Sequence, residues 1–211
     1  MSRVLRALIL HEFIDKARDR WVLISSAMFA LLALSIASYG GNEGAANMVT
    51  APSLVTLSAL IVPLVALLLG HEAIVGERER HTLGLLLSLP IHRGEVILAK
   101  FFGRSMALAV SIGIGLGASS LVLAAGQREL VLNLLPATLL LGSSFLSLGI
   151  LISVLADRVA TAVSLAVVCL FVLVFFYDLG LLALMVATDG SISPELISWL
   201  VSLNPTGLYR T

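Results

Sequence analysis

The chain has 211 residues, of which 59% are hydrophobic and only 12% charged, and its formal net charge is zero. Soluble domains have about 45–50% apolar and about 25% charged residues, so this composition excludes a soluble domain and indicates an integral membrane protein. The chain has no basic patch of the kind that would indicate a nucleic-acid partner. A single cysteine, Cys169, lies inside an apolar run, so no disulfide can form within the chain.

Residues 1–20 carry charges of both signs, with Leu10, Phe13 and Ile14 at helical spacing. This pattern predicts an interfacial helix on the membrane surface. A helix that continues directly into the first span is the alternative, and it leaves the topology unchanged.

Five apolar runs are long enough to cross about 30 Å of hydrocarbon as helices. The predicted spans are 21–39, 51–75, 97–125, 131–156 and 161–187. The runs are continuous rather than alternating, which argues against barrel strands. The predicted fold is therefore an all-α, polytopic helical bundle, with residues 1–211 forming a single transmembrane domain.

Lys and Arg are distributed unevenly about these spans, and membrane proteins keep such residues in their cytoplasmic loops. Only Arg128 and Arg210 fall on one side. The other eleven share the opposite side: Arg3, Arg6, Lys16, Arg18, Arg20, Arg78, Arg80, Arg93, Lys100, Arg104 and Arg158. We therefore predict a cytoplasmic N-terminus and, with five spans, a C-terminus on the other side.

Residues 76–96 form a charged insert between the second and third spans. Its apolar centre, Thr82–Pro90, is too short to cross a membrane and has charges on both sides. The charge count places it in the cytoplasm, where we predict a docking surface for a partner. The chain has no Gly-x-x-x-x-Gly-Lys-[Ser/Thr] loop, so any ATP must be handled by that partner.

The fifth run has 27 residues and would extend about 40 Å as a helix, longer than the hydrocarbon core. We predict a break near Asp178, followed by a re-entrant segment over 178–205 on the outer side. One uninterrupted, tilted helix is the alternative. Asp178 is a candidate for a translocation role because it lies inside an apolar run, and a solvated turn residue is the alternative.

Candidate residues for chemistry or helix packing are few. His71 and Glu72 lack the second His of a zinc-protease helix, so no metal site is predicted. Copper conduction is disfavoured, because Cys169 stands alone and the methionines are scattered. Gly113 and Gly117 are four residues apart, which predicts close packing of the third span against another helix.

The insert resembles the cytoplasmic segment of type-2 ABC transporter permeases. The resemblance is carried by Glu77-Arg78-Glu79-Arg80-His81-Thr82-Leu83, by Leu86-Leu87-Ser88-Leu89-Pro90, and by Arg93-Gly94-Glu95 with Lys100. It implies a coupling helix that docks on a separate ATPase subunit, which holds ATP and Mg²⁺, whereas this chain binds no cofactor. The docking residues it implies are Glu77, Glu79, Thr82, Leu83, Leu85, Leu86, Leu87, Ser88, Leu89, Pro90 and Arg93. The chain departs from the family at His81, where Gly is frequent, and at Gly84, where Glu is frequent.

Two further segments, Tyr177–Leu182 and Leu203–Arg210, resemble the branch of this family that serves maturation of nitrous oxide reductase. This implies a homodimer in the bacterial inner membrane with two ATPase subunits and a periplasmic maturation protein. The exported substrate would be a sulfur species for the copper-sulfide cluster of the reductase. The family has six spans, so the sixth would follow Thr211. Export of copper, a drug, a lipid or a glycan, a membrane anchor without transport, and an intramembrane enzyme using His71, Glu72 and Asp178 remain alternatives.

Overall fold

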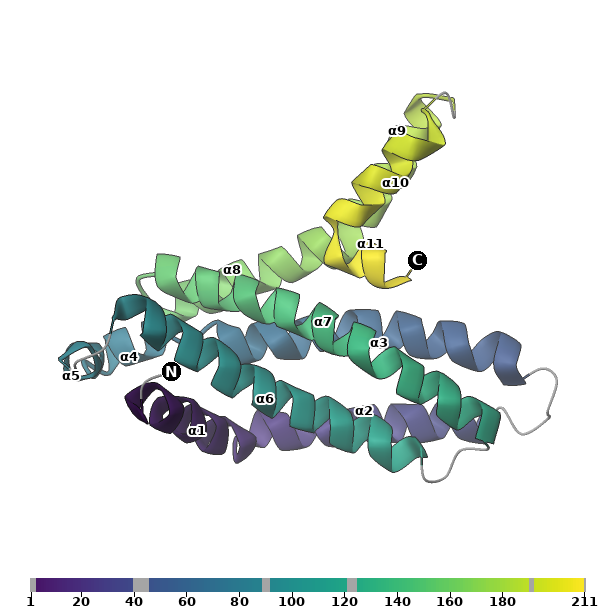
Figure 1. Cartoon of the computed structure of the whole chain (residues 1–211). Helices are drawn as coiled ribbons and strands as arrows, with labels where there is room; N and C mark the ends of the chain where they lie inside the picture. The colour runs from purple at the N-terminus through teal and green to yellow at the C-terminus, as the bar shows by residue number, and fades with distance from the viewer. Residues whose placement is uncertain (1–2, 40–45, 89–91, 121–124, 190–191, 211) are drawn as a thin grey trace.

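The computed structural model describes residues 3–39, 46–88, 92–120, 125–189 and 192–210, and all regular elements in these ranges are helices (Figure 1). The predicted all-α fold is confirmed. The helices of the first half are α1 (Arg3–Ala17), α2 (Arg20–Tyr39), α3 (Ala46–Gly70), α4 (Val75–Glu79), α5 (Leu83–Leu87) and α6 (Arg93–Ser120). Those of the second half are α7 (Ala125–Leu155), α8 (Val159–Phe171), the π-helix Val172–Phe176, α9 (Tyr177–Ala187), α10 (Pro194–Leu203) and α11 (Pro205–Arg210).

Four helices among the described residues are long and apolar enough to cross a membrane. They cover Val55–Glu79, Arg93–Gly117, Leu132–Leu155 and Val159–Ala187. They correspond to the second through fifth predicted spans. The first predicted span, 21–39, is the helix α2, whose described apolar part is Val22–Leu31.

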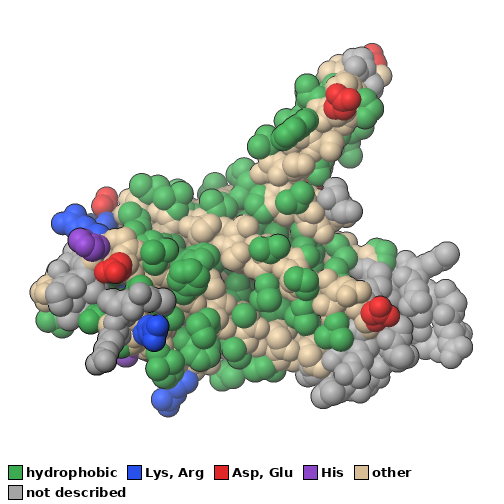
Figure 2. Space-filling model, viewed as in Figure 1, with side chains coloured by type: hydrophobic (Ala, Val, Ile, Leu, Met, Phe, Trp, Pro, Cys, Tyr) green, Lys and Arg blue, Asp and Glu red, His purple; other side chains and the backbone are tan. Residues whose placement is uncertain are grey.

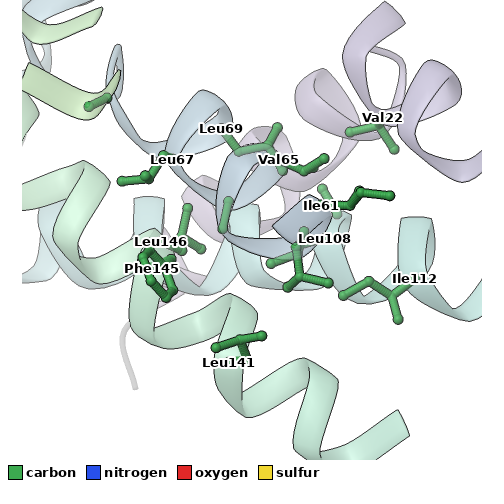
Figure 3. Packing of buried hydrophobic residues seen from close by; sticks show 14 of the residues in the cluster. Val22, Ile61, Val65, Leu67, Leu69, Leu108, Ile112, Leu141, Phe145 and Leu146 are labelled. Atoms are coloured by element: carbon green, nitrogen blue, oxygen red, sulfur yellow. The ribbon is translucent and has the colours of Figure 1, made fainter. Parts of the chain in front are cut away.

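The core lies where α3, α6 and α7 pack side by side, with α2 against α6 (Figures 1 and 3). Val65 of α3, Leu108 and Ile112 of α6, and Phe145 and Leu146 of α7 are buried members of one hydrophobic cluster (Figure 3). Each helix therefore buries one apolar face in the bundle and leaves the opposite apolar face to the surroundings, as a membrane-spanning bundle allows.

The close packing predicted at Gly113 and Gly117 is not made against the described residues of this chain. A Cβ atom added at either position would meet no atom within 4 Å, whereas one at Gly115 would lie 2.4 Å from Cβ of Phe29 on α2. Gly115 is thus the position at which α6 and α2 approach closely. The sequence pattern identified the right stretch of α6 but the wrong face, because spacing alone does not say which side meets the neighbour.

The fifth predicted span is helical without a gap from α8 through the π-helix to α9, so the helix is not interrupted at Asp178 itself, whereas the predicted change of direction is present a few residues earlier. The irregularity is instead the π-helix just before Tyr177, where the helix bends (Figure 1). Beyond it, α9 and α10 form a hairpin that leaves the bundle at an angle (Figure 1). Neither helix of the hairpin has a buried residue, whereas α11 returns to pack on α3 and α7.

Candidate functional site at the α4–α5 end

The short helices α4 and α5 lie together at one end of the bundle, next to the start of α1 (Figure 1). Charged and histidine side chains gather at this end, while the rest of the visible face is mostly apolar (Figure 2). The predicted docking residues from Glu77 to Ser88 therefore occupy the most polar part of this view. This end is the candidate functional site.

Helix α5 is a single turn from which the apolar side chain of Leu85 points outward. Leu85 is 75% exposed, whereas Leu83 packs against the hydrophobic core and Leu86 is half-buried. The helix in the predicted apolar centre Thr82–Pro90 is thus short, Leu83–Leu87. Leu89, Pro90 and the side chain of Leu87 lie outside the described residues.

The polar residues beside α5 hold its backbone. Thr82 donates its hydroxyl hydrogen to the Glu77 carbonyl at 3.3 Å, and Ser88 donates to the Leu85 carbonyl at 2.7 Å. After the undescribed residues 89–91, Glu95 accepts the His92 amide hydrogen at 3.1 Å and closes the first turn of α6. Arg93 is exposed at the start of α6. These contacts hold the turn in place and leave Leu85 free for a partner.

Glu77 ties α4 to α6. Its Oε1 lies 2.5 Å from Nζ of Lys100, and the same ammonium group lies 2.5 Å from Oε1 of Glu12 on α1. Lys100 is only 1% exposed. A buried cation needs charged partners close by, so these two carboxylates allow Lys100 to lie inside the protein. One ammonium group therefore links α1, α4 and α6.

Arg78 ties α4 to the end of α7. Its guanidinium donates to the Ala156 carbonyl at 2.7 Å and to the Val154 carbonyl at 3.4 Å. The last carbonyls of a helix have no partner within the helix, and a cation there also complements the helix dipole. Ser153 adds a second connection, because its Oγ accepts the amide hydrogens of Ile74 and Val75 at 2.9 and 3.1 Å.

Glu79 ties α4 to the start of α8. Its Oε1 accepts the amide hydrogen of Val159 at 2.7 Å, which satisfies a donor that the first turn of α8 leaves unpaired. Three consecutive residues, Glu77–Glu79, thus each contact a different membrane helix. We call Glu77, Arg78 and Glu79 the α4 link.

A second group of ion pairs fastens the same end. Lys16 of α1 lies 2.6 Å from Glu72, and Arg104 of α6 donates to the Leu69 carbonyl at the end of α3. Burial of Glu12 opposes its ionisation, but the nearby cations, Lys100 foremost, outweigh burial and hold the pKa of Glu12 below its ordinary value. Glu12 and Lys16 of α1 are therefore directed into the protein, whereas Leu10 and Ile14 are exposed.

Sequence reasoning did not identify Glu12, Lys16, Lys100 or Arg104 as members of one site. A signal was present, since Lys100 and Arg104 lie one helical turn apart near the start of an apolar run. A charge in such a position must find a partner inside the protein. The identity of the partner cannot be read in this way, because Glu12 is 88 residues from Lys100.

His81 adopts a backbone conformation that favours glycine. Its φ is 58°, in the left-handed region where a Cβ atom is strained. The residue ends α4 and turns the chain toward α5. The frequency of Gly here in the family that this segment resembles thus has a geometric reason, and His81 keeps the turn at some cost in strain.

The intramembrane-enzyme alternative uses His71, Glu72 and Asp178, and the two carboxylates among them have separate partners. Glu72 pairs with Lys16, and Asp178 pairs with Arg210 at the other side of the fold. Among the described residues, no group of three His, Cys, Asp or Glu side chains gathers. The arrangement offers ion pairs and helix caps that connect helices, rather than a nucleophile beside a general base.

Comparison with known proteins decides the family. A family model described as "ABC-2 family transporter protein" matches residues 6–211, nearly the whole chain. The chain belongs to the ABC-2 transporter family. It is similar to a "Probable ABC transporter permease protein NosY" of Pseudomonas aeruginosa, with 40% identity over 94% of this chain and 77% of the relative. A protein of the same description from Stutzerimonas stutzeri is 39% identical over the same shares of both chains.

These matches confirm the resemblance to type-2 ABC permeases on which the sequence analysis relied. The chain is an ABC transporter permease, a NosY-like membrane subunit for transport. Such a permease implies an ATPase as partner in the same transporter.

Proposed function

We propose that this permease is the membrane subunit of an exporter driven by a separate ATPase, and that the ATPase docks on α5. The observation that carries the proposal is the exposed Leu85, which points outward from a turn whose first residue, Leu83, is packed on the core. A large apolar side chain presented at the polar end of a molecule is typical of an anchor that fills a pocket on a partner.

The α4 link supplies a path from that contact into the membrane. A movement of α5 displaces α4, and α4 is fastened to α6 by Glu77, to α7 by Arg78 and to α8 by Glu79. ATP-driven closure of the ATPase then moves three helices together, and the bundle opens toward the other side. The excess of Lys and Arg at this end supports a cytoplasmic position for α5 and for the N-terminus in the inner membrane.

Our proposal for the substrate and for the other subunits rests on two observations. These are the resemblance of Tyr177–Leu182 and Leu203–Arg210 and the two relatives described as NosY. We propose that two copies of this chain work with two ATPase subunits and a periplasmic maturation protein. The exported substrate is a sulfur species for the copper-sulfide cluster of nitrous oxide reductase. Reductase from cells that lack the permease should then contain copper but lack cluster sulfide; an intact cluster would disprove this assignment.

The docking proposal is tested by co-purification of the ATPase with permease variants. Leu85→Asp places a charge where the ATPase pocket is apolar and should abolish co-purification, whereas Leu85→Met keeps the apolar contact and should retain it. Both variants should be extracted from the membrane in equal amounts, because Leu85 is exposed. An ATPase that binds the Leu85→Asp permease as well as the unaltered one would overturn docking on α5.

A further inference from the structure

The two segments that resemble the nitrous oxide reductase branch, 177–182 and 203–210, meet at one place in the fold. Asp178 of the first segment forms an ion pair with Arg210 of the second. Next to Asp178, Tyr177 donates its hydroxyl hydrogen to the carbonyl of Leu200 on α10 at 2.5 Å. The meeting point is the base of the α9–α10 hairpin, beside α11 (Figure 1). Their joint role is not explained by ATPase docking, which takes place at the α4–α5 end.

The π-helix Val172–Phe176 lies at this base and leaves a carbonyl for outside donors. The Tyr177 amide bonds the Val172 carbonyl, five residues earlier, and α9 then continues with four-residue spacing. Where backbone hydrogen bonds five residues apart give way to bonds four residues apart, one carbonyl receives no backbone amide hydrogen. The Leu173 carbonyl receives side-chain donors instead: Nδ2 of Asn204 lies at 2.7 Å, and Oγ1 of Thr206 lies at 3.1 Å. The single hydroxyl hydrogen of Thr206 is shared between this carbonyl and Oδ1 of Asn204, which lies at 2.8 Å.

Asn204 joins this carbonyl to the start of α11. Its Oδ1 accepts the Thr206 amide hydrogen at 3.2 Å, and Pro205 occupies the first helical position, so Asn204 caps α11. Asn204 and Thr206 are both 0% exposed. The amide group thus uses one end to cap α11 and the other end to hold the π-helix.

Helix α11 is fastened to the bundle, while the hairpin is not. Oγ1 of Thr138 on α7 lies 2.9 Å from the Tyr209 hydroxyl, and Thr206 and Gly207 are buried. In contrast, α9 and α10 contain no buried residue. The direction in which the hairpin leaves the bundle therefore depends on the polar contacts at its base rather than on a packed interface.

We propose that Asn204 and Thr206 are positioning residues that set the direction of the α9–α10 hairpin by holding the π-helix, and that the transport cycle releases this hold. The inference rests on the proposed export function. When the donors leave the Leu173 carbonyl, the helix relaxes to regular α spacing. A shift by one residue rotates everything beyond it by about 100°, so α9 turns and the hairpin takes a second direction.

The experiment measures the distance between spin labels on the hairpin and on the bundle in the complete transporter. Val186→Cys on α9 and Leu140→Cys on α7 supply two exposed sites, in a chain that also carries Cys169→Ala. Labelled chains are assembled with an excess of unlabelled permease and with the ATPase, so that label pairs within one chain dominate. The unaltered permease should give one distance without nucleotide and a second distance after trapping with ATP and vanadate.

Thr206→Val removes the hydroxyl while keeping the shape, and it should show the second distance without nucleotide. Thr206→Ser keeps the hydroxyl and should match the unaltered permease, as the control. Asn204→Ser keeps a capping oxygen for α11 but loses the donor to Leu173, so it should resemble Thr206→Val. The proposal would be overturned if Thr206→Val and Asn204→Ser gave the same distance without nucleotide as the unaltered permease. It would also be overturned if Thr206→Ser behaved like Thr206→Val.

Co-purification of the ATPase, measured on the same samples, separates this proposal from the docking proposal. The base of the hairpin is far along the chain from α5, so all three variants should bind the ATPase normally. If the unaltered permease fails to bind, docking on α5 fails; if binding is normal and the distances do not change in Thr206→Val, only the hairpin proposal fails.

Discussion

The carboxylate of Glu79 accepts the amide hydrogen of Val159 at 2.7 Å, although the two residues are 80 positions apart. This contact connects the helix that leads into α5 with the first turn of a membrane span. Together with Arg78 on α7 and Glu77 on Lys100, it makes α4 the common neighbour of three spans. The following predictions test the contacts on which this arrangement depends.

Removal of the Lys100 charge should destabilise the fold strongly. Lys100→Met leaves the carboxylates of Glu12 and Glu77 buried beside each other without their cation, and loss of one partner of a buried ion pair costs about 3–5 kcal/mol. The measurement is the midpoint of thermal unfolding of the purified permease. Adding Glu77→Gln to Lys100→Met should recover part of the loss, because the unpaired carboxylate of Glu77 is removed while Glu12 keeps Arg104 at 3.5 Å. A Lys100→Met permease as stable as the unaltered one would refute the buried network.

Stability should fall in acid through Glu12. The folded-state pKa of Glu12 is lowered, so its ion pairs contribute stability above the unfolded-state pKa of about 4.3. That contribution is lost as the pH falls through the lower folded-state pKa. Unfolding midpoints between pH 7 and 3 should therefore drop less steeply in Glu12→Gln than in the unaltered permease. Parallel curves for the two proteins would show that Glu12 does not titrate in this way.

Two glycines on α6 should respond differently to the same substitution. Gly115→Ala forces a Cβ atom against Phe29 and should destabilise by about 1–3 kcal/mol, the usual cost of overpacking. Gly113→Ala meets open space and should be neutral or gain up to about 1 kcal/mol from helix propensity. Thermal unfolding of the two variants side by side checks this. Equal losses would mean that α2 does not approach α6 at Gly115.

The turn at His81 should be relieved by glycine. His81→Gly removes the strained Cβ at a φ of 58° and should stabilise the permease by about 0.5–1 kcal/mol. His81→Ala keeps the Cβ and should bring no such gain, which makes it the matched control. Identical unfolding midpoints for the Gly and Ala variants would contradict the strained turn.

Most of the fold follows from the sequence, because continuous apolar runs of about 20 residues leave few choices to a chain in a membrane. The predicted spans and the short helix at α5 were found in this way. The π-helix could not be predicted, since it exists where Asn204, thirty-one residues beyond Leu173, supplies a donor. Local pattern at Tyr177–Gly180 indicated an irregularity there but not its kind.

The sequence predicts the position of the candidate site but not the contacts within it. Leu85 lies within the segment marked by its short length and flanking charges, so the sequence alone includes it in the predicted docking surface. The roles of Glu77, Arg78 and Glu79 depend on helices that come 23 to 80 residues later. In the sequence these three residues form only a run of alternating charges, whereas in the fold each has its own partner.

The most direct test of the α4 link is whether ATP still changes the far side of the permease when Glu79 no longer caps α8. Val186→Cys on α9, in a chain that carries Cys169→Ala, is labelled with a membrane-impermeant maleimide in vesicles that contain the ATPase, with and without ATP. Glu79→Ala should bind the ATPase and allow hydrolysis, but the ATP-dependent change in labelling should disappear. Glu79→Gln keeps the accepting oxygen and should preserve that change. If Glu79→Ala shows the same change as the unaltered permease, α4 does not carry the movement through Glu79.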